Sequence, residues 1–232
     1  MVTAGRVAGG FWGQLPERER QLLQSAGRAR IFPPEATVCA QGDLATHVFV
    51  LVSGWVKVTV VTSGGQQALL ALRGNGDVVG ELAGEVAGCR TATIKTIGQV
   101  RSIIVPHPRF VMFLDTNPAA ARAYRHALTE RWNDTAESLR IQSISSGAER
   151  LARLLLELAA EHGRGDAHHT TIELPLSQEE LASLASASRA TVTRALGAWR
   201  RRRLVETSPR HITITDRDAL ARIAVLGPDW PG

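Results

Sequence analysis

The residues best suited to chemistry in this 232-residue chain stand in two places, and the first is a glycine-containing stretch around residue 80. Gly80 and Glu81 are adjacent, and Glu81 precedes the pair Arg90-Thr91 by nine residues. Glycine lets a main chain approach a phosphate closely, and an arginine fork can hold a phosphodiester through charge-assisted hydrogen bonds. Glu81 can accept a hydrogen bond from a ribose hydroxyl. The spacing fits an anion pocket, and it also fits a plain structural salt bridge between Glu81 and Arg90.

The second place is an arginine-rich stretch in the C-terminal part of the chain. Seven arginines and a single acidic residue, Glu206, stand between residues 189 and 211. Positive charge concentrated in this way attracts nucleic-acid phosphates whatever the base sequence. A solvated surface helix would explain the charge by itself, so the elements around these arginines decide between the two interpretations.

Those elements form a predicted helix-turn-helix. The motif Ser177-Gln178-Glu179-Glu180 is a capping box, which predicts a helix over 178–185. Ser188 can cap a second helix over 189–203. Two short strands expected within 204–215 would add a hairpin and make the motif winged.

The second predicted helix has two distinct faces. Val192, Leu196 and Trp199 lie on the side expected to pack against the domain. The opposite side, near the helix N-terminus, points into the major groove when such a helix lies there, and arginine can bond both acceptors of a guanine edge. The residues we expect to contact DNA are Ser188, Arg189, Ala190, Thr193 and Arg194.

Residues 31–105 follow the period of β-strands. Val48, Val50 and Val52 alternate with their neighbours, and glycine-bearing turns such as Gly74-Asn75-Gly76 interrupt the runs. Many short strands at close spacing indicate an antiparallel sandwich or barrel. The GxGxxG motif of dinucleotide-binding folds is absent from the sequence.

A long helix is predicted between the two regions, over 117–144, with Asn117 as a possible cap before Pro118. Its length of roughly 40 Å exceeds what one small barrel covers. The apolar stripe predicts pairing with a second copy of the helix, whereas the alternative is a helix that packs wholly on its own domain. The stripe consists of Tyr124, Leu128, Trp132 and Leu139, with Thr135 and Ala136 set into it.

The composition excludes some classes of protein but does not indicate a function. The chain is 44% hydrophobic and carries a net charge of +5, its two cysteines provide no disulfide framework, and no apolar run approaches the ~20 residues that span a bilayer. We expect a soluble cytoplasmic protein of the α+β class. The predicted division is an N-terminal antiparallel β-roll over 1–116, a long helix over 117–145 and a winged helix-turn-helix domain over 146–232.

In this order of elements the chain resembles the cyclic-AMP receptor protein and FNR family of bacterial transcription regulators. Residues 80–93, GELAGEVAGCRTAT, resemble the family's phosphate cassette, and residues 188–194, SRATVTR, resemble its recognition-helix motif. The resemblance implies that Glu81 binds the ribose 2′-hydroxyl and that Arg90 and Thr91 bind the cyclic phosphate. The same resemblance implies surrounding main-chain contacts from Gly80 and Leu82, and an adenine contact from Thr135.

The resemblance implies a homodimeric regulator that binds palindromic double-stranded DNA in response to a cyclic nucleotide, with cAMP as the expected ligand and RNA polymerase as a further partner. It implies no enzymatic activity and no cofactor. A family regulator with an empty pocket or another effector is the alternative. Ala136 stands where the receptor protein has a serine that reaches the partner's ligand, and Ser186 stands where the helix-turn-helix usually has a glycine.

Metal-dependent branches of the family are disfavoured by the sequence. An iron–sulfur member needs four cysteines, and this chain has two, Cys39 and Cys89. Cys89 and the seven histidines are haem ligands only in principle. A zinc site would be conceivable in the histidine-containing stretch, but a polar surface loop is the preferred interpretation. The residues of that stretch are His162, Asp166, His168 and His169.

Overall fold

The computed structural model divides the chain into two compact units that meet within one long helix. The first unit ends at Asn133 and the second begins at Asp134. The boundaries predicted from the sequence lie at the two ends of this helix instead. The residues that the structure describes are 10–65, 67–81, 88–165, 169–208 and 211–227.

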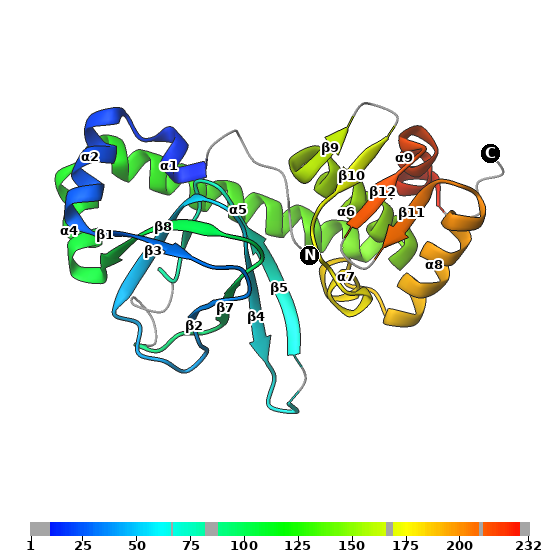
Figure 1. Ribbon diagram of the computed structural model, residues 1–232, viewed down its shortest axis with the longest axis horizontal. Helices are drawn as coiled ribbons and strands as arrows, with labels where there is room; N and C mark the ends of the chain where they lie inside the picture. The colour runs from blue at the N-terminus through cyan, green and yellow to red at the C-terminus, as the bar shows by residue number, and fades with distance from the viewer. Residues whose placement is uncertain (1–9, 66, 82–87, 166–168, 209–210, 228–232) are drawn as a thin grey trace. The chain divides into compact units, whose positions relative to one another are not determined.

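The first unit is built from two antiparallel four-stranded sheets (Figure 1). One sheet has the strand order β1-β8-β3-β6 and the other the order β2-β7-β4-β5. The strands are β1 Arg28–Phe32, β2 Thr37–Cys39, β3 His47–Ser53, β4 Val56–Val61, β5 Gln67–Arg73, β6 Val78–Val79, β7 Thr93–Thr96 and β8 Val100–Pro106.

Two clusters of buried side chains hold this unit together. One, which includes Phe49, Leu51 and Val100, fills the space between the sheets. In the other, Phe11, Val48 and Val105 are among the side chains that join the first sheet to the helices beside it. These helices are α1 Gly10–Gln14, α2 Glu17–Ala26, α4 His107–Thr116 and the first half of α5 Pro118–Ile144.

The structure adds detail at both ends of this region. Helices α1 and α2 are separated by Leu15 and Pro16. Pro16 has no N–H and therefore cannot continue the hydrogen-bond ladder of α1. The Asn117 side chain donates from Nδ2 to the Phe113 carbonyl at 2.8 Å, so it satisfies the end of α4.

The second unit combines helices with a small antiparallel sheet of order β11-β12-β10-β9. The structure also contains β9 and α9, two elements that were not predicted from the sequence. Leu151, Leu155, Leu196 and Leu220 are among the buried side chains of its core. The elements are α6 Gly147–His162, β9 Gly163–Gly165, β10 Thr170–Ile172, α7 Gln178–Leu184, α8 Arg189–Arg201, β11 Val205–Ser208, β12 His211–Ile214 and α9 Arg217–Leu226.

The α+β prediction is confirmed by these two units. Helix α6 begins at a Ser146 cap whose side chain accepts from the Glu149 N–H. α7 has the complete capping box, in which Ser177 accepts from the Glu180 N–H and the Glu180 carboxylate accepts from the Ser177 N–H. Local capping therefore fixes where the helices of this unit start.

Candidate ligand pocket and DNA-reading helix

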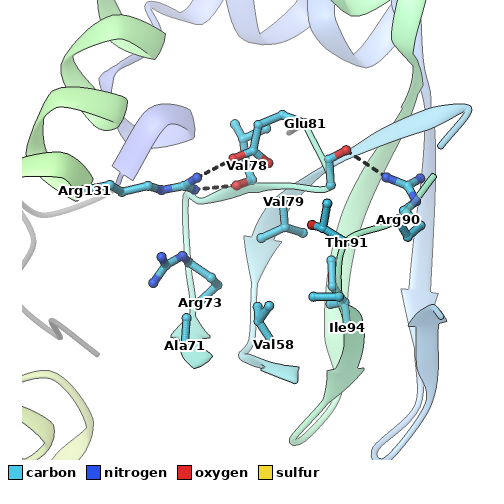
Figure 2. Close-up of a pocket in the computed structure, with 12 residues that line it drawn as sticks. Val58, Ala71, Arg73, Val78, Val79, Glu81, Arg90, Thr91, Ile94 and Arg131 are labelled. Carbon is cyan, nitrogen blue, oxygen red and sulfur yellow. Dashed lines mark hydrogen bonds and ion pairs between the residues drawn. The ribbon is translucent and has the colours of Figure 1, made fainter. Parts of the chain in front are cut away.

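A cavity with about 540 Å³ of empty space, partly open to solvent, lies in the first unit. Apolar side chains form part of its wall, and three arginines and one glutamate also line it (Figure 2). The excess of arginine over glutamate in this lining favours an anion. The described lining residues are Val58, Ala71, Arg73, Val78, Val79, Gly80, Glu81, Arg90, Thr91, Ala92, Ile94 and Arg131.

Arg90 is the most deeply placed of the three arginines, with 5% of its surface exposed. Its Nη1 donates to the Gly80 carbonyl at 2.8 Å and its Nη2 donates to the His47 carbonyl at 2.7 Å. The buried Nε has no hydrogen-bond partner within the described part of the chain. A guanidinium carries five N–H groups, so Arg90 is anchored by two and retains donors for a ligand.

Gly80 is fixed by its main-chain conformation and by Arg90. Its φ is +82°, a value that favours glycine, and a Cβ at this position would lie 2.5 Å from Arg90 Nη1. Any side chain here would therefore displace the anchored guanidinium. The glycine of the cassette has a steric role in addition to its main-chain carbonyl, which holds Arg90.

Glu81 contacts Arg131 of α5, with Arg131 Nη1 lying 2.6 Å from Glu81 Oε1. Arg131 Nη2 also donates to the Val78 carbonyl and lies 3.7 Å from Asp77 Oδ1. Both Glu81 and Asp77 are buried. The salt bridge between Glu81 and Arg90, which the sequence left open, is therefore wrong: Glu81 pairs with the long helix and Arg90 with main-chain carbonyls.

Arg131 is a pocket residue that the sequence analysis missed. It lies on α5 one turn before Thr135, between apolar positions, and a charge inside an apolar stripe was the available signal. Arg73 at the end of β5 was missed as well, and its Nη1 donates to the Leu72 carbonyl at 2.9 Å. Strand periodicity predicts which way a side chain points, but it does not predict that a cavity lies there.

The remaining predicted pocket residues are placed as follows. Thr91 lines the cavity beside Arg90, and Figure 2 shows the two on the side opposite Arg131. Leu82 lies outside the described residues. Thr135 is exposed on α5 and is not among the described residues that line the cavity, and Ala136 is exposed as well.

The helix-turn-helix has the predicted geometry. The Ser188 side chain accepts from the Thr191 N–H and caps α8. Ser186, in the turn between α7 and α8, has a φ of +47°. Ser186 therefore adopts a left-handed conformation that favours glycine, which costs a serine about 1 kcal/mol.

The two predicted faces of α8 are also present. Val192, Leu196 and Trp199 are buried, whereas Arg189, Ala190, Thr193 and Arg194 are exposed. Thr193 Oγ1 donates to Gln178 Oε1 at 2.7 Å, and Arg189 Nη1 lies 3.7 Å from Glu179 Oε2. Both contacts are made to the first turn of α7, so they orient the exposed face of α8. Arg210, one of the seven arginines between residues 189 and 211, lies outside the described residues.

The apolar stripe of α5 divides into two parts. The Tyr124 ring packs at 5.9 Å from Phe11 and 5.4 Å from Phe110, within the core of its own unit. The assignment of Tyr124 to a partner-facing stripe is therefore wrong. Trp132 and Leu139, one heptad apart, are 74% and 61% exposed.

Other candidate chemistry finds no support in the described part of the chain. No cluster of three or more histidine, cysteine or acidic side chains suited to a metal occurs among the described residues. Cys39 is buried and Cys89 exposed, and neither forms a disulfide. No described helix is both long and apolar enough to cross a bilayer.

Known proteins match both units. The model of the cyclic nucleotide-binding domain matches residues 29–117, and that of the Crp-like helix-turn-helix domain matches residues 149–223. The CRP-like cAMP-activated global transcriptional regulator of Mycobacterium tuberculosis is 30% identical over 193 residues, which cover 83% of this chain and 86% of that protein. The cyclic AMP receptor protein of Thermus thermophilus is 29% identical over 217 residues, with 92% and 95% covered.

Solved structures agree on the fold. The c-di-GMP responsive global regulator CLP of Xanthomonas campestris has a TM-score of 0.73 at 22% identity, with 86% of this chain and 99% of that chain covered. Fold, cavity and recognition helix together define a DNA-binding transcription regulator with a cyclic nucleotide-binding domain. The chain belongs to the cyclic-AMP receptor protein and FNR family of bacterial transcription regulators.

Proposed function

We propose that this regulator is a homodimer whose DNA binding is controlled by a cyclic nucleotide, with cAMP as the ligand. The observation that carries the proposal is Arg90, buried at the cavity wall with two N–H groups anchored and others retained for an anion. A buried guanidinium beside Gly80 and Thr91 suits one phosphodiester charge. The two curated relatives described above are named for cAMP, which favours this ligand.

In this proposal the residues predicted from the sequence have separate roles. Arg90 and Thr91 bind the cyclic phosphate, and Gly80 and Leu82 contribute main-chain contacts. The adenine contact belongs to Thr135, which is not among the described residues that line the cavity. Glu81 accepts a hydrogen bond from the ribose 2′-hydroxyl while it remains paired with Arg131. Because Arg131 belongs to α5, a ligand at Glu81 acts on a residue of the long helix.

That contact provides a basis for allosteric control. A ligand shifts a conformational equilibrium only if it binds one state more tightly than the other, and DNA must then raise ligand affinity by the same factor. α5 continues from Arg131 to Ile144, which is roughly 20 Å of helix. We expect ligand-dependent displacement of this helix to change the DNA-binding competence of α8.

Dimerisation would use the exposed part of α5. Trp132 and Leu139 are large apolar side chains on one side of a helix, and a second copy of the helix would remove both from water. A two-fold dimer carries two recognition helices related by symmetry, so its DNA site would be a palindrome. RNA polymerase is the further partner we propose for a regulator of this family.

Calorimetry with cAMP and cGMP tests the ligand assignment. Wild-type protein should bind cAMP, and Arg90→Ala should weaken binding by about 2–4 kcal/mol, or roughly 30-fold or more, because the buried phosphate loses its charged partner. Arg101→Ala, an exposed arginine on β8 outside the described cavity lining, is the matched control and should bind as wild type does. Absence of binding at millimolar cAMP would contradict the assignment and favour another effector or an empty pocket.

A further inference from the structure

Arg150, in the first turn of α6, donates to three main-chain carbonyls. Its Nε donates to the Ala185 carbonyl at 2.8 Å and its Nη2 to the Ser186 carbonyl at 2.6 Å. Its Nη1 donates to the Ser145 carbonyl. One side chain thus contacts two segments that stand about 40 residues apart in the sequence.

These carbonyls stand at the ends of two functional helices. Ser145 directly follows α5, and Ala185 is the C-cap of α7. The last carbonyls of a helix lack partners within it and carry the negative end of its dipole. Ser186 lies in the turn that sets the direction of α8, with its φ of +47°. The guanidinium therefore caps the long helix and the helix-turn-helix turn together.

Close packing supports this junction. A Cβ on Gly147, the first residue of α6, would lie 3.0 Å from the Ala187 Cβ and 3.1 Å from the Thr191 Cγ2. Ala187 belongs to the turn and Thr191 to the first turn of α8. The start of α6 is thus in contact with both segments, and the Ser145 carbonyl stands only two residues before it.

We propose that Arg150 is a positioning residue that couples the end of α5 to the recognition helix; the proposal rests on the ligand-controlled function proposed above. A displacement of the α5 end moves the Ser145 carbonyl, and the planar guanidinium moves with it because its three donors have a fixed geometry. The Ala185 and Ser186 carbonyls then follow, and α8 is redirected. An ammonium group is a single point charge on a flexible stem and cannot reproduce this rigid fork.

The test compares DNA affinity with and without saturating cAMP in wild type, Arg150→Lys and Arg150→Gln. An allosteric effector typically changes affinity about 5- to 150-fold. We expect both variants to reduce the ratio of DNA affinity with cAMP to DNA affinity without cAMP to less than about threefold. The affinity of both variants for cAMP should stay within about threefold of wild type. Arg153→Gln is the matched control. Arg153 lies one turn further along α6 and donates to the Ala224 carbonyl of α9 at 2.9 Å, so it should retain the wild-type ratio.

If Arg150 had a purely structural role, its substitution would weaken DNA binding equally with and without cAMP. A wild-type effect of cAMP on DNA affinity in both variants would therefore overturn the proposal. Wild type that shows no cAMP effect would instead refute the proposed function, so the two failures are distinguishable. If neither variant folds, hydrogen exchange on wild type decides. cAMP should then change the protection of the Ser186 and Ala187 amides, which donate to carbonyls of α7, and unchanged protection would overturn the proposal.

Discussion

At the scale of single residues, a buried carboxyl group makes the stability of the second unit depend on pH. Burial raises the pKa of Glu157 to about 7, with Glu161 and Asp134 adding to the rise and Arg153 opposing it. The native state holds this proton up to pH 7, whereas an unfolded chain releases it near 4.5. The associated stability is therefore complete below about pH 4.5 and is lost as the pH rises to 7.

Glu157→Gln should remove this loss because the amide stays neutral. The variant should gain roughly 1–3 kcal/mol over wild type at pH 8 and little at pH 4.5, measured by denaturant unfolding across that range. Glu173→Gln, which changes an exposed carboxyl of the same unit, is the matched control and should keep the wild-type pH slope. If the unfolding free energies of wild type and Glu157→Gln depend on pH in the same way, a group other than Glu157 causes the pH dependence.

Which site residues the sequence could predict depended on whether their partners are local. Gly80, Glu81, Arg90 and Thr91 stand in one contiguous cassette, and the structure brings them to one cavity. The role of Arg131 in the pocket could not be predicted because its partner Glu81 lies 50 residues away in the sequence. The role of Arg150 could not be predicted for the same reason, since no pattern of spacing marks a side chain that bonds to distant main-chain carbonyls.

At the scale of elements, the exposed side chains of α8 predict which base pairs the protein recognises. The family motif places a glutamate after the first arginine, where it accepts a hydrogen bond from a cytosine amino group, but here the residue is the exposed Ala190. Arg189 and Arg194 remain able to bind guanines. We therefore expect two strongly specified G·C pairs in each half-site and a loosely specified pair between them, since a polar base contact contributes about 1–3 kcal/mol of discrimination.

Binding-site selection on wild type and Ala190→Glu measures the base preference at each position of the half-site. The variant should acquire a sharp C·G preference at one position, while Arg189→Ala and Arg194→Ala each relax a different flanking position. If wild type already requires C·G there as strictly as the variant does, the assumed placement of α8 in the groove is wrong.

The elements themselves were predictable where caps or periodicity mark them. Ser177, Ser188 and the alternating valines of β3 are such marks, and the corresponding helices and strand are present. The break at Pro16 and the inward packing of Tyr124 were not predicted. The apolar stripe of α5 does not tell which of its residues face the unit's own core, because Phe11 and Phe110 meet Tyr124 only in the folded chain.

At the scale of the whole molecule, the exposed part of α5 predicts the oligomeric state. The double substitution Trp132→Glu with Leu139→Glu should give monomers in sedimentation, because unpaired charges in an apolar interface are costly. Met112→Glu with Val225→Glu alters side chains that are 64% and 75% exposed on α4 and α9, and this matched control should remain dimeric. A dimeric Trp132/Leu139 variant would place the interface on another surface.

Control of DNA binding by the pocket is the central feature of the proposed function. The measurement that tests it most directly is the affinity of wild type and Arg90→Ala for a palindromic DNA fragment, recovered by binding-site selection, with and without saturating cAMP. We predict that cAMP tightens wild-type binding within the 5- to 150-fold range typical of allosteric effectors and leaves Arg90→Ala unchanged. Equal DNA affinity of wild type with and without cAMP would contradict the account.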